Sequence, residues 1–98
     1  MSEPDFTIIR EDGPTNGRYV IDLGEGAEAE MTYRKGADGV MIIDHTGVPP
    51  AFEGRGIALR LVNKAIGDAR EEGFKITPLC SYVVAQFRRH PEWSDLRG

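Results

Sequence analysis

Apolar and polar positions alternate along the first half of the chain, a pattern that predicts β-strands. Residues 5–10 (DFTIIR) and 18–23 (RYVIDL) are two such segments, and the sequence EDGPTNG between them is rich in turn-forming residues. In the second segment, alternation places Tyr19, Ile21 and Leu23 on one face. We therefore expect the chain to begin with two strands joined by a turn.

A second pair of strands follows the first. Residues 27–35 (AEAEMTYRK) alternate glutamate and threonine with alanine, methionine and tyrosine, and residues 40–48 (VMIIDHTGV) are rich in β-forming residues. Asp38 and Gly39 lie between them and are typical of a hairpin turn with positive φ angles. Strands joined in sequence by short turns favour an antiparallel meander.

After Pro49 the spacing of the apolar residues changes from two to three and four, which predicts an amphipathic helix between Gly56 and Gly73. Gly73 is a suitable C-terminal cap. The apolar side of this helix is expected to carry Ile57, Leu59, Leu61, Val62, Ala65, Ile66 and Ala69, and the opposite, charged side Arg60, Lys64, Asp68, Arg70 and Glu71.

A short strand and a second helix complete the pattern. Residues 74–79 (FKITPL) predict a strand that Pro78 ends or places at an edge. Ser81 is expected to cap a helix that stops before Pro91, and Trp93 in the tail is expected to pack on the core. The order β-β-β-β-α-β-α predicts an α+β (α/β-like) fold, with the fourth and fifth strands parallel through a right-handed crossover.

The composition narrows the class of function. The 98 residues are enough for one domain, which we expect to span residues 1–98, and the formal net charge is −4. Binding to nucleic acid needs an excess of lysine and arginine, so we expect no nucleic-acid partner. The N-terminal residues lack the apolar segment of a signal peptide, and no apolar run approaches the roughly 20 residues of a membrane span. With Cys80 as the single cysteine, these features favour a cytoplasmic protein.

The segment VPPAFEGRGIALRL, residues 48–61, places Gly54 and Gly56 directly before the predicted helix. The first N–H groups of a helix bind anions, and glycine lets a ligand approach the backbone, so the segment could hold a phosphate with help from Arg55. The alternative is that the glycines only turn the chain. A P-loop is excluded because no Lys-Ser/Thr pair follows the glycines. A dinucleotide-binding fingerprint is excluded because its third glycine or alanine would fall at position 59, which is leucine.

The same segment resembles the pyrophosphate-binding motif of the GNAT acyltransferase superfamily, Gln/Arg-x-x-Gly-x-Gly/Ala. Gly56 and Ala58 stand at its last two fixed positions, whereas Glu53 stands where glutamine or arginine is usual. Two longer stretches, HTGVPPAFEGRGIALRLV and PLCSYVVAQFRRHPEW, are similar to a family of very short GNAT-like proteins. The resemblance extends over about residues 6–96. Members of this family lack the helices that larger relatives have between the first two strands, and the last strands as well.

The resemblance implies a minimal GNAT fold in which the fourth and fifth strands splay apart and coenzyme A lies in the gap. Pantetheine would hydrogen-bond to the backbone near Thr46 and Val48, and the acetyl thioester of acetyl-CoA would lie near Cys80. Arg88 could reach the adenosine phosphates, or it could be one of the basic residues usual at a helix end. The pyrophosphate would contact the segment of Glu53, Gly54, Arg55, Gly56, Ile57 and Ala58.

Three side chains are candidates for chemistry. The Cys80 thiolate could accept the acyl group, although free cysteines are often simply buried. His45 could take a proton from a substrate ammonium group, or it could be a surface residue. Tyr82 resembles the tyrosine that protonates the departing thiolate in larger relatives, or it packs. The related short proteins often carry glutamate where this chain has Gly47, so that base is missing, and the N–H near Val48 is the candidate oxyanion donor.

The sequence therefore predicts an acetyl-CoA-dependent N-acetyltransferase that acts on an amine of a protein tail, a polyamine or a small molecule. We expect no metal, because His45, His90 and Cys80 do not make a ligand set. The acidic balance mildly favours a cationic acceptor. The alternatives are a coenzyme A-binding module without turnover and a protein-interaction domain whose glycines only form a turn.

Overall fold

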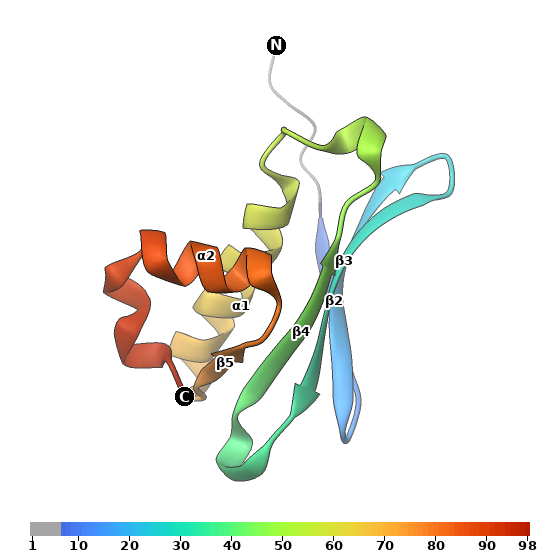
Figure 1. The fold of residues 1–98 in the computed structure, drawn as a ribbon. Coiled ribbons are helices and arrows are strands. Elements are labelled where there is room, and N and C mark those ends of the chain that lie inside the picture. Colours follow the sequence, from blue (N-terminus) through green and yellow to red (C-terminus); the bar gives the residue numbers. More distant parts are fainter. Residues whose placement is uncertain (1–6) are drawn as a thin grey trace.

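The computed structural model describes residues 7–98, in which five strands and two α-helices follow the predicted order β-β-β-β-α-β-α (Figure 1). The fold is therefore mixed α+β. Three short 3₁₀ helices occupy the connections and the tail of the described chain. The strands are β1 (Ile8–Asp12), β2 (Asn16–Gly24), β3 (Ala27–Lys35), β4 (Met41–Gly47) and β5 (Ile76–Pro78), the α-helices are α1 (Ile57–Glu72) and α2 (Ser81–Arg89), and the 3₁₀ helices are Ala37–Gly39, Pro50–Phe52 and Pro91–Leu96.

The strands lie in the sheet in the order in which they occur in the chain. β1 to β4 pair antiparallel, and β4 pairs with β5 in parallel, so the predicted meander and the predicted parallel pairing of the fourth and fifth strands are both confirmed. The turn between β3 and β4 also has the predicted conformation, because Asp38 and Gly39 have φ angles of 59° and 74°. α1 packs against β3, and α2 lies beside β4 and β5 (Figure 1).

A β-bulge interrupts the alternation of β4. Thr32 pairs with His45 and Tyr33 pairs with Ile43, so Asp44 is an extra residue on the β4 side. Ile43 is fully buried, whereas Asp44 and His45 are both exposed. Because two successive residues face outward, Thr46 turns back to the inner face, the face that packs against the helices.

The core lies between the sheet and the helices. On β3 the alternation works as predicted: Ala29, Met31 and Tyr33 are buried on the inner face, whereas Glu28 is exposed on the outer face. Trp93 is 5% exposed and forms a T-shaped ring pair with Phe87 of α2, so the tail does return to the core. The inner face of β2 and the apolar side of α1 supply most of the remaining core, with Tyr19, Ile21, Ile57, Leu61, Val62, Ala65, Ile66 and Ala69 buried.

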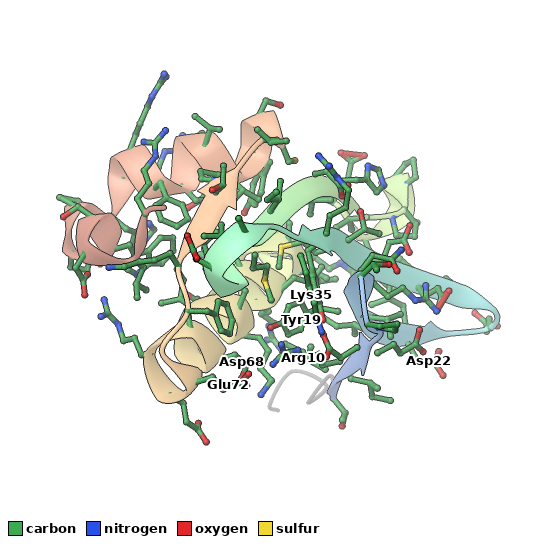
Figure 2. The ribbon with its side chains drawn as sticks, turned by 90° about the horizontal axis from the view of Figure 1, so that it is seen from below. Arg10, Tyr19, Asp22, Lys35, Asp68 and Glu72 are labelled. Carbon is green, nitrogen blue, oxygen red and sulfur yellow. The ribbon has the colours of Figure 1, made fainter. Side chains whose placement is uncertain are left out.

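Asp68 of α1 is the main departure from the predicted helix faces. The sequence pattern places it on the charged, outer side, but it is only 7% exposed and points toward the sheet. Its Oδ2 accepts hydrogen bonds from the Tyr19 hydroxyl at 2.8 Å and from Arg10 at 3.4 Å, and its Oδ1 accepts one from Lys64 at 3.2 Å. Arg10 also donates to Glu72 at 2.7 Å. Figure 2 shows Arg10, Tyr19, Asp68 and Glu72 gathered between the strands and α1. This polar cluster ties β1 and β2 to the helix.

Several predicted boundaries differ from the structure. β1 continues to Asp12 and β2 begins at Asn16, so the turn between them shortens to residues 13–15 because the strand ladder extends into the polar segment. Residues 5 and 6 of the first predicted strand lie outside the described residues. β4 ends at Gly47, one residue before the prediction, and begins one residue later.

The C-terminal third also differs in detail. Cys80, not Ser81, precedes α2 as its N-cap, since Cys80 is extended and Ser81 is already helical. The tail forms the 3₁₀ helix Pro91–Leu96, and Arg97 then bridges in parallel to Ile76 at the free edge of β5. Sequence patterns do not predict this edge contact because it depends on where the tail is carried by the preceding helices. Among residues 7–98, no helix is long and apolar enough to cross a membrane.

Candidate functional site

A cleft of about 490 Å³ opens where β4 ends and α1 begins. Its origin is the divergence of β4 and β5. The last pair between these strands is Ile43 with Pro78, and the N–H groups of Leu79 and Cys80 both donate to the Ile43 carbonyl. β4 then continues to Gly47, whereas the segment that follows β5 turns into α2. The cleft is lined by Thr46, Gly47, Val48, Phe52, Glu53, Gly54, Gly56, Ile57, Ala58 and Tyr82.

The floor of the cleft includes the glycine segment and the first turn of α1. Gly54 and Gly56 have φ angles of 80° and 75°, a left-handed conformation that strongly favours glycine. Apart from the two adjacent residues of the chain, no heavy atom of the described residues lies within 4 Å of a Cβ built at either glycine. Gly56 is the N-cap of α1 and has no side chain that could accept a hydrogen bond from the first N–H groups. These donors and the helix dipole can therefore bind an anion in the cleft.

Two side chains of opposite charge, Glu53 and Arg55, lie at the glycine segment. The guanidinium of Arg55 lies over the ring of Phe52, 5.3 Å from its centroid, and Phe52 lines the cleft. Arg55 itself is exposed and is not one of the lining residues. Glu53 does line the cleft and brings a negative charge. The segment thus combines a cation at its rim with a carboxylate that disfavours a bound anion.

Cys80 lies next to the cleft rather than on its lining. Its thiol donates a hydrogen bond to the Thr46 hydroxyl, with a Sγ–Oγ1 distance of 3.5 Å, and Thr46 lines the cleft. Burial by itself would raise the pKa of the Cys80 thiol. Once the proton has left, however, the Thr46 hydroxyl and the backbone N–H groups of Val83, Tyr82 and Thr46 can donate hydrogen bonds to the thiolate, and these outweigh burial. The pKa of Cys80 is therefore lowered, and its thiolate forms more readily than that of an ordinary cysteine.

Tyr82 lines the cleft from the first turn of α2. Burial raises the pKa of its phenol, an effect that the positive charge of Arg89 and a hydrogen bond with Gln86 only partly offset. The phenol is therefore protonated at neutral pH and can donate a proton to a group in the cleft.

Two of the predicted site residues lie elsewhere. The bulge in β4 turns His45 to the outer face of the sheet, where its Nε2 is 3.9 Å from Glu30 Oε2. Simple alternation along β4 would have placed His45 on the inner face with Ile43. Arg88 is exposed in the last turn of α2 and is not a lining residue, about 9 Å along the helix from Tyr82 at 1.5 Å per residue.

Phe52 and Gly47 also line the cleft, although the sequence did not single them out for this role. The sequence position of Phe52, an aromatic residue between the Pro-Pro pair and the glycines, was the signal that could have indicated its place in the cleft. Within residues 7–98, no three His, Cys, Asp or Glu side chains come together in a group that could hold a metal ion.

The sheet order, the splayed strands and a cleft at the N-terminus of a central helix match a GNAT-type fold. A family model of GCN5-related N-acetyltransferases matches residues 18–96, and the chain belongs to this family. It is also similar to a GCN5-like protein from Staphylococcus aureus whose structure was solved in solution by NMR. The two chains share 28% identical residues and a TM-score of 0.70, over 92% of this chain and 87% of the other. The comparison with curated proteins found no match. Family membership supports acyltransfer as the chemistry of this protein.

Proposed function

We propose that this protein transfers an acetyl group from acetyl-CoA to a primary amine. The observation that carries the proposal is the cleft, because nearly all residues predicted for coenzyme A line it, at the end of β4 and at the start of α1. In this arrangement the first N–H groups of α1 bind the pyrophosphate, and the backbone from Thr46 to Val48 binds pantetheine. Arg55 and Arg88 remain candidates for outer phosphate contacts, since long cationic side chains can reach beyond the rim.

The proposed reaction is a direct exchange. The amine nitrogen attacks the thioester carbonyl carbon, the C–N bond forms and the C–S bond to coenzyme A breaks. The N–H of Val48, which follows the last residue of β4, is the candidate donor to the oxyanion, and Tyr82 gives its proton to the departing thiolate. The protons that the amine releases pass to solvent, because His45, the predicted base, is on the outer face of the sheet and does not line the cleft. Most of the rate enhancement would come from positioning and from fixed backbone dipoles.

A thermal shift measurement with acetyl-CoA tests ligand binding. At a ligand concentration 100-fold above the dissociation constant, the folded state gains about 2.7 kcal/mol. For a chain of this size, that gain corresponds to a rise in Tm of roughly 10–20 °C. The absence of any shift would refute the proposal and favour a plain interaction domain. A shift without acetylation of any amine would favour a coenzyme A-binding module without turnover.

A matched pair of variants locates the binding. Ala58→Glu places a carboxylate in the first turn of α1, where the helix dipole favours it for folding but where it repels the pyrophosphate. Two unit charges about 6 Å apart repel by about 3 kcal/mol at an effective dielectric constant near 20, or roughly 100-fold in affinity. Gly67→Glu makes the same charge change at an exposed position farther along α1. We expect Gly67→Glu to bind acetyl-CoA as the wild type does.

A covalent route through Cys80 is the second candidate mechanism, favoured by the lowered pKa of its thiol and its contact with Thr46. The thiolate would attack the thioester carbonyl carbon, releasing coenzyme A as the thiol, and the amine would then attack the new thioester and restore Cys80. Intact mass spectrometry after incubation with acetyl-CoA alone would show one added acetyl group, absent in Cys80→Ala. Wild-type turnover by Cys80→Ala would exclude this route and leave direct transfer.

A further inference from the structure

Thr46 reaches the cleft because β4 is bulged. Without the extra residue Asp44, alternation from the buried Ile43 would turn Thr46 to the outer face of the sheet. The bulge instead turns Thr46 to the inner face, where it lines the cleft. The wall that β4 contributes to the cleft therefore carries a hydroxyl group, two residues before Val48, whose N–H is the candidate oxyanion donor.

Cys80 faces this hydroxyl from the start of α2. The N–H groups of Leu79 and Cys80 donate to the Ile43 carbonyl at 2.9 and 3.1 Å, which fixes the start of α2 beside β4 (Figure 1). The Cys80 thiol then contacts the Thr46 hydroxyl, with a Sγ–Oγ1 distance of 3.5 Å. Among residues 7–98, this thiol is the hydrogen-bonding side chain that the Thr46 hydroxyl contacts.

The place of Cys80 at the end of a helix decides which of the two groups donates. Cys80 is the N-cap of α2, and the N–H groups of Tyr82 and Val83 are directed toward its sulfur, although the neutral thiol makes no cap hydrogen bond. Their partial positive charge disfavours a further hydrogen on that side of the sulfur. The S–H hydrogen therefore points to Thr46 Oγ1.

A threonine hydroxyl has one hydrogen to donate and two lone pairs that accept. Since the Thr46 oxygen accepts from Cys80, its own hydrogen remains available to another partner. Thr46 lines the cleft, so that partner is a group bound in the cleft. The pair thus presents a hydrogen-bond donor whose direction is set before a ligand arrives.

We propose that the Thr46 hydroxyl is a second donor to the oxyanion of the transfer reaction and that Cys80 is the positioning residue that orients it. The inference rests on the proposed acetyl-CoA-dependent function and deepens it. As the amine attacks, the C–N bond forms and the Val48 N–H and the Thr46 O–H hold the negative charge on the thioester oxygen. The C–S bond then breaks and Tyr82 protonates the departing sulfur. Thr46 keeps its proton throughout, and Cys80 forms no bond to the substrate.

Infrared spectroscopy of bound [1-13C]acetyl-CoA tests the contact without an acceptor amine. A donor to the thioester oxygen polarises the carbonyl and lowers its stretching frequency. We expect a lower frequency in the wild type and in Thr46→Ser, which keeps the hydroxyl, than in Thr46→Val, which has the same shape without it. Thr15→Val, at an exposed turn position, is the matched control and should give the wild-type frequency. Equal frequencies in the wild type and Thr46→Val would overturn the proposal.

Steady-state kinetics with butylamine or spermidine as the acceptor test the effect on catalysis. Loss of one oxyanion donor typically lowers kcat by about 100-fold, and we expect this loss in Thr46→Val. The dissociation constant of acetyl-CoA should change less than about threefold, because the interaction strengthens only in the transition state. Thr46→Ser should restore most of kcat. If Thr46→Val instead weakens acetyl-CoA binding and leaves kcat unchanged, the hydroxyl is a binding contact and the proposal is wrong.

A double-mutant cycle tests the role of Cys80. Cys80→Ala leaves the Thr46 hydroxyl in place without its orienting partner, and kcat should fall about tenfold, within the coupling range of residues in contact. In the Thr46→Val background, Cys80→Ala should lower kcat no further, because no hydroxyl remains to be oriented. Two effects that multiply would show that Cys80 acts independently of Thr46. Loss of all turnover in Cys80→Ala, with an acetyl group on the wild-type sulfur, would make Cys80 the nucleophile and refute its positioning role.

The failure of the two proposals can be told apart. A wild type that binds acetyl-CoA and acetylates no amine refutes the proposed transfer, and the carbonyl frequencies still decide whether Thr46 contacts the thioester oxygen. Turnover with equal kcat values in the wild type and Thr46→Val refutes only the role of Thr46.

Discussion

Asp68 offers the sharpest test of what holds α1 against the sheet. It is 7% exposed, and the Tyr19 hydroxyl that donates to it at 2.8 Å belongs to a fully buried side chain. Asp68→Ala leaves that hydroxyl without its acceptor, and a buried donor without a partner costs about 1–3 kcal/mol. Arg10 is less affected because it keeps Glu72 at 2.7 Å. We therefore expect Asp68→Ala to lower the free energy of unfolding by about 2 kcal/mol.

Urea and thermal unfolding measure this loss. For a domain of this size, about 2 kcal/mol corresponds to a fall in Tm of roughly 8–16 °C. Lys64→Ala is the matched control, because it removes the other half of an i,i+4 pair whose lysine is 44% exposed. Such exposed pairs contribute about 0.3–0.5 kcal/mol. If Asp68→Ala lowers the free energy of unfolding no more than Lys64→Ala does, and the slope of that free energy with urea concentration is the same in both variants, the buried hydrogen bond does not stabilise the fold as argued.

A double-mutant cycle isolates the pair itself. Tyr19→Phe combined with Asp68→Asn removes the hydroxyl and the charge together, and the coupling energy should be at least about 0.5 kcal/mol because the groups are in contact. Asp68 lies 11 residues after the first residue of α1, or about 16 Å along the helix at 1.5 Å per residue. The folded variants should therefore bind acetyl-CoA with unchanged affinity.

Three further outcomes are expected. Tyr82→Phe should lower kcat about 100-fold with little change in the dissociation constant of acetyl-CoA, because it removes a proton donor; equal kcat values would remove Tyr82 from the mechanism. Gly73→Ala should cost about 1 kcal/mol, since Gly73 has a φ of 80°, whereas Gly67→Ala inside α1 should stabilise the fold in the same urea series. The hydrogen bond from Lys35 lowers the pKa of Asp12. The ionised Asp12 carboxylate therefore stabilises the fold fully above its unfolded-state pKa, and this effect is lost as the pH falls through the folded-state pKa. Lys35→Met should raise the pKa of Asp12 in carboxyl NMR titrations, and an unchanged pKa would contradict this assignment.

The sequence by itself determined the elements and their order. Alternation on β3 correctly separated the buried Ala29, Met31 and Tyr33 from Glu28 and Glu30. The sequence also predicted the helical period of α1 and its cap at Gly73. A buried helix face requires apolar residues at that period, and a left-handed cap favours glycine. The glycine segment and the family resemblance predicted a ligand site between the end of β4 and the start of α1, where the cleft lies.

Tertiary structure alone decided which side chains meet. The bulge at Asp44 turns His45 to the outer face, and no periodic pattern marks the position of one extra residue. Asp68 occupies a polar position of its helix, yet it is buried because Tyr19 and Arg10 reach it from strands about 50 residues away. Thr46 likewise meets Cys80 across 34 positions. These contacts depend on strand register and helix placement, which residue types along the chain constrain only weakly.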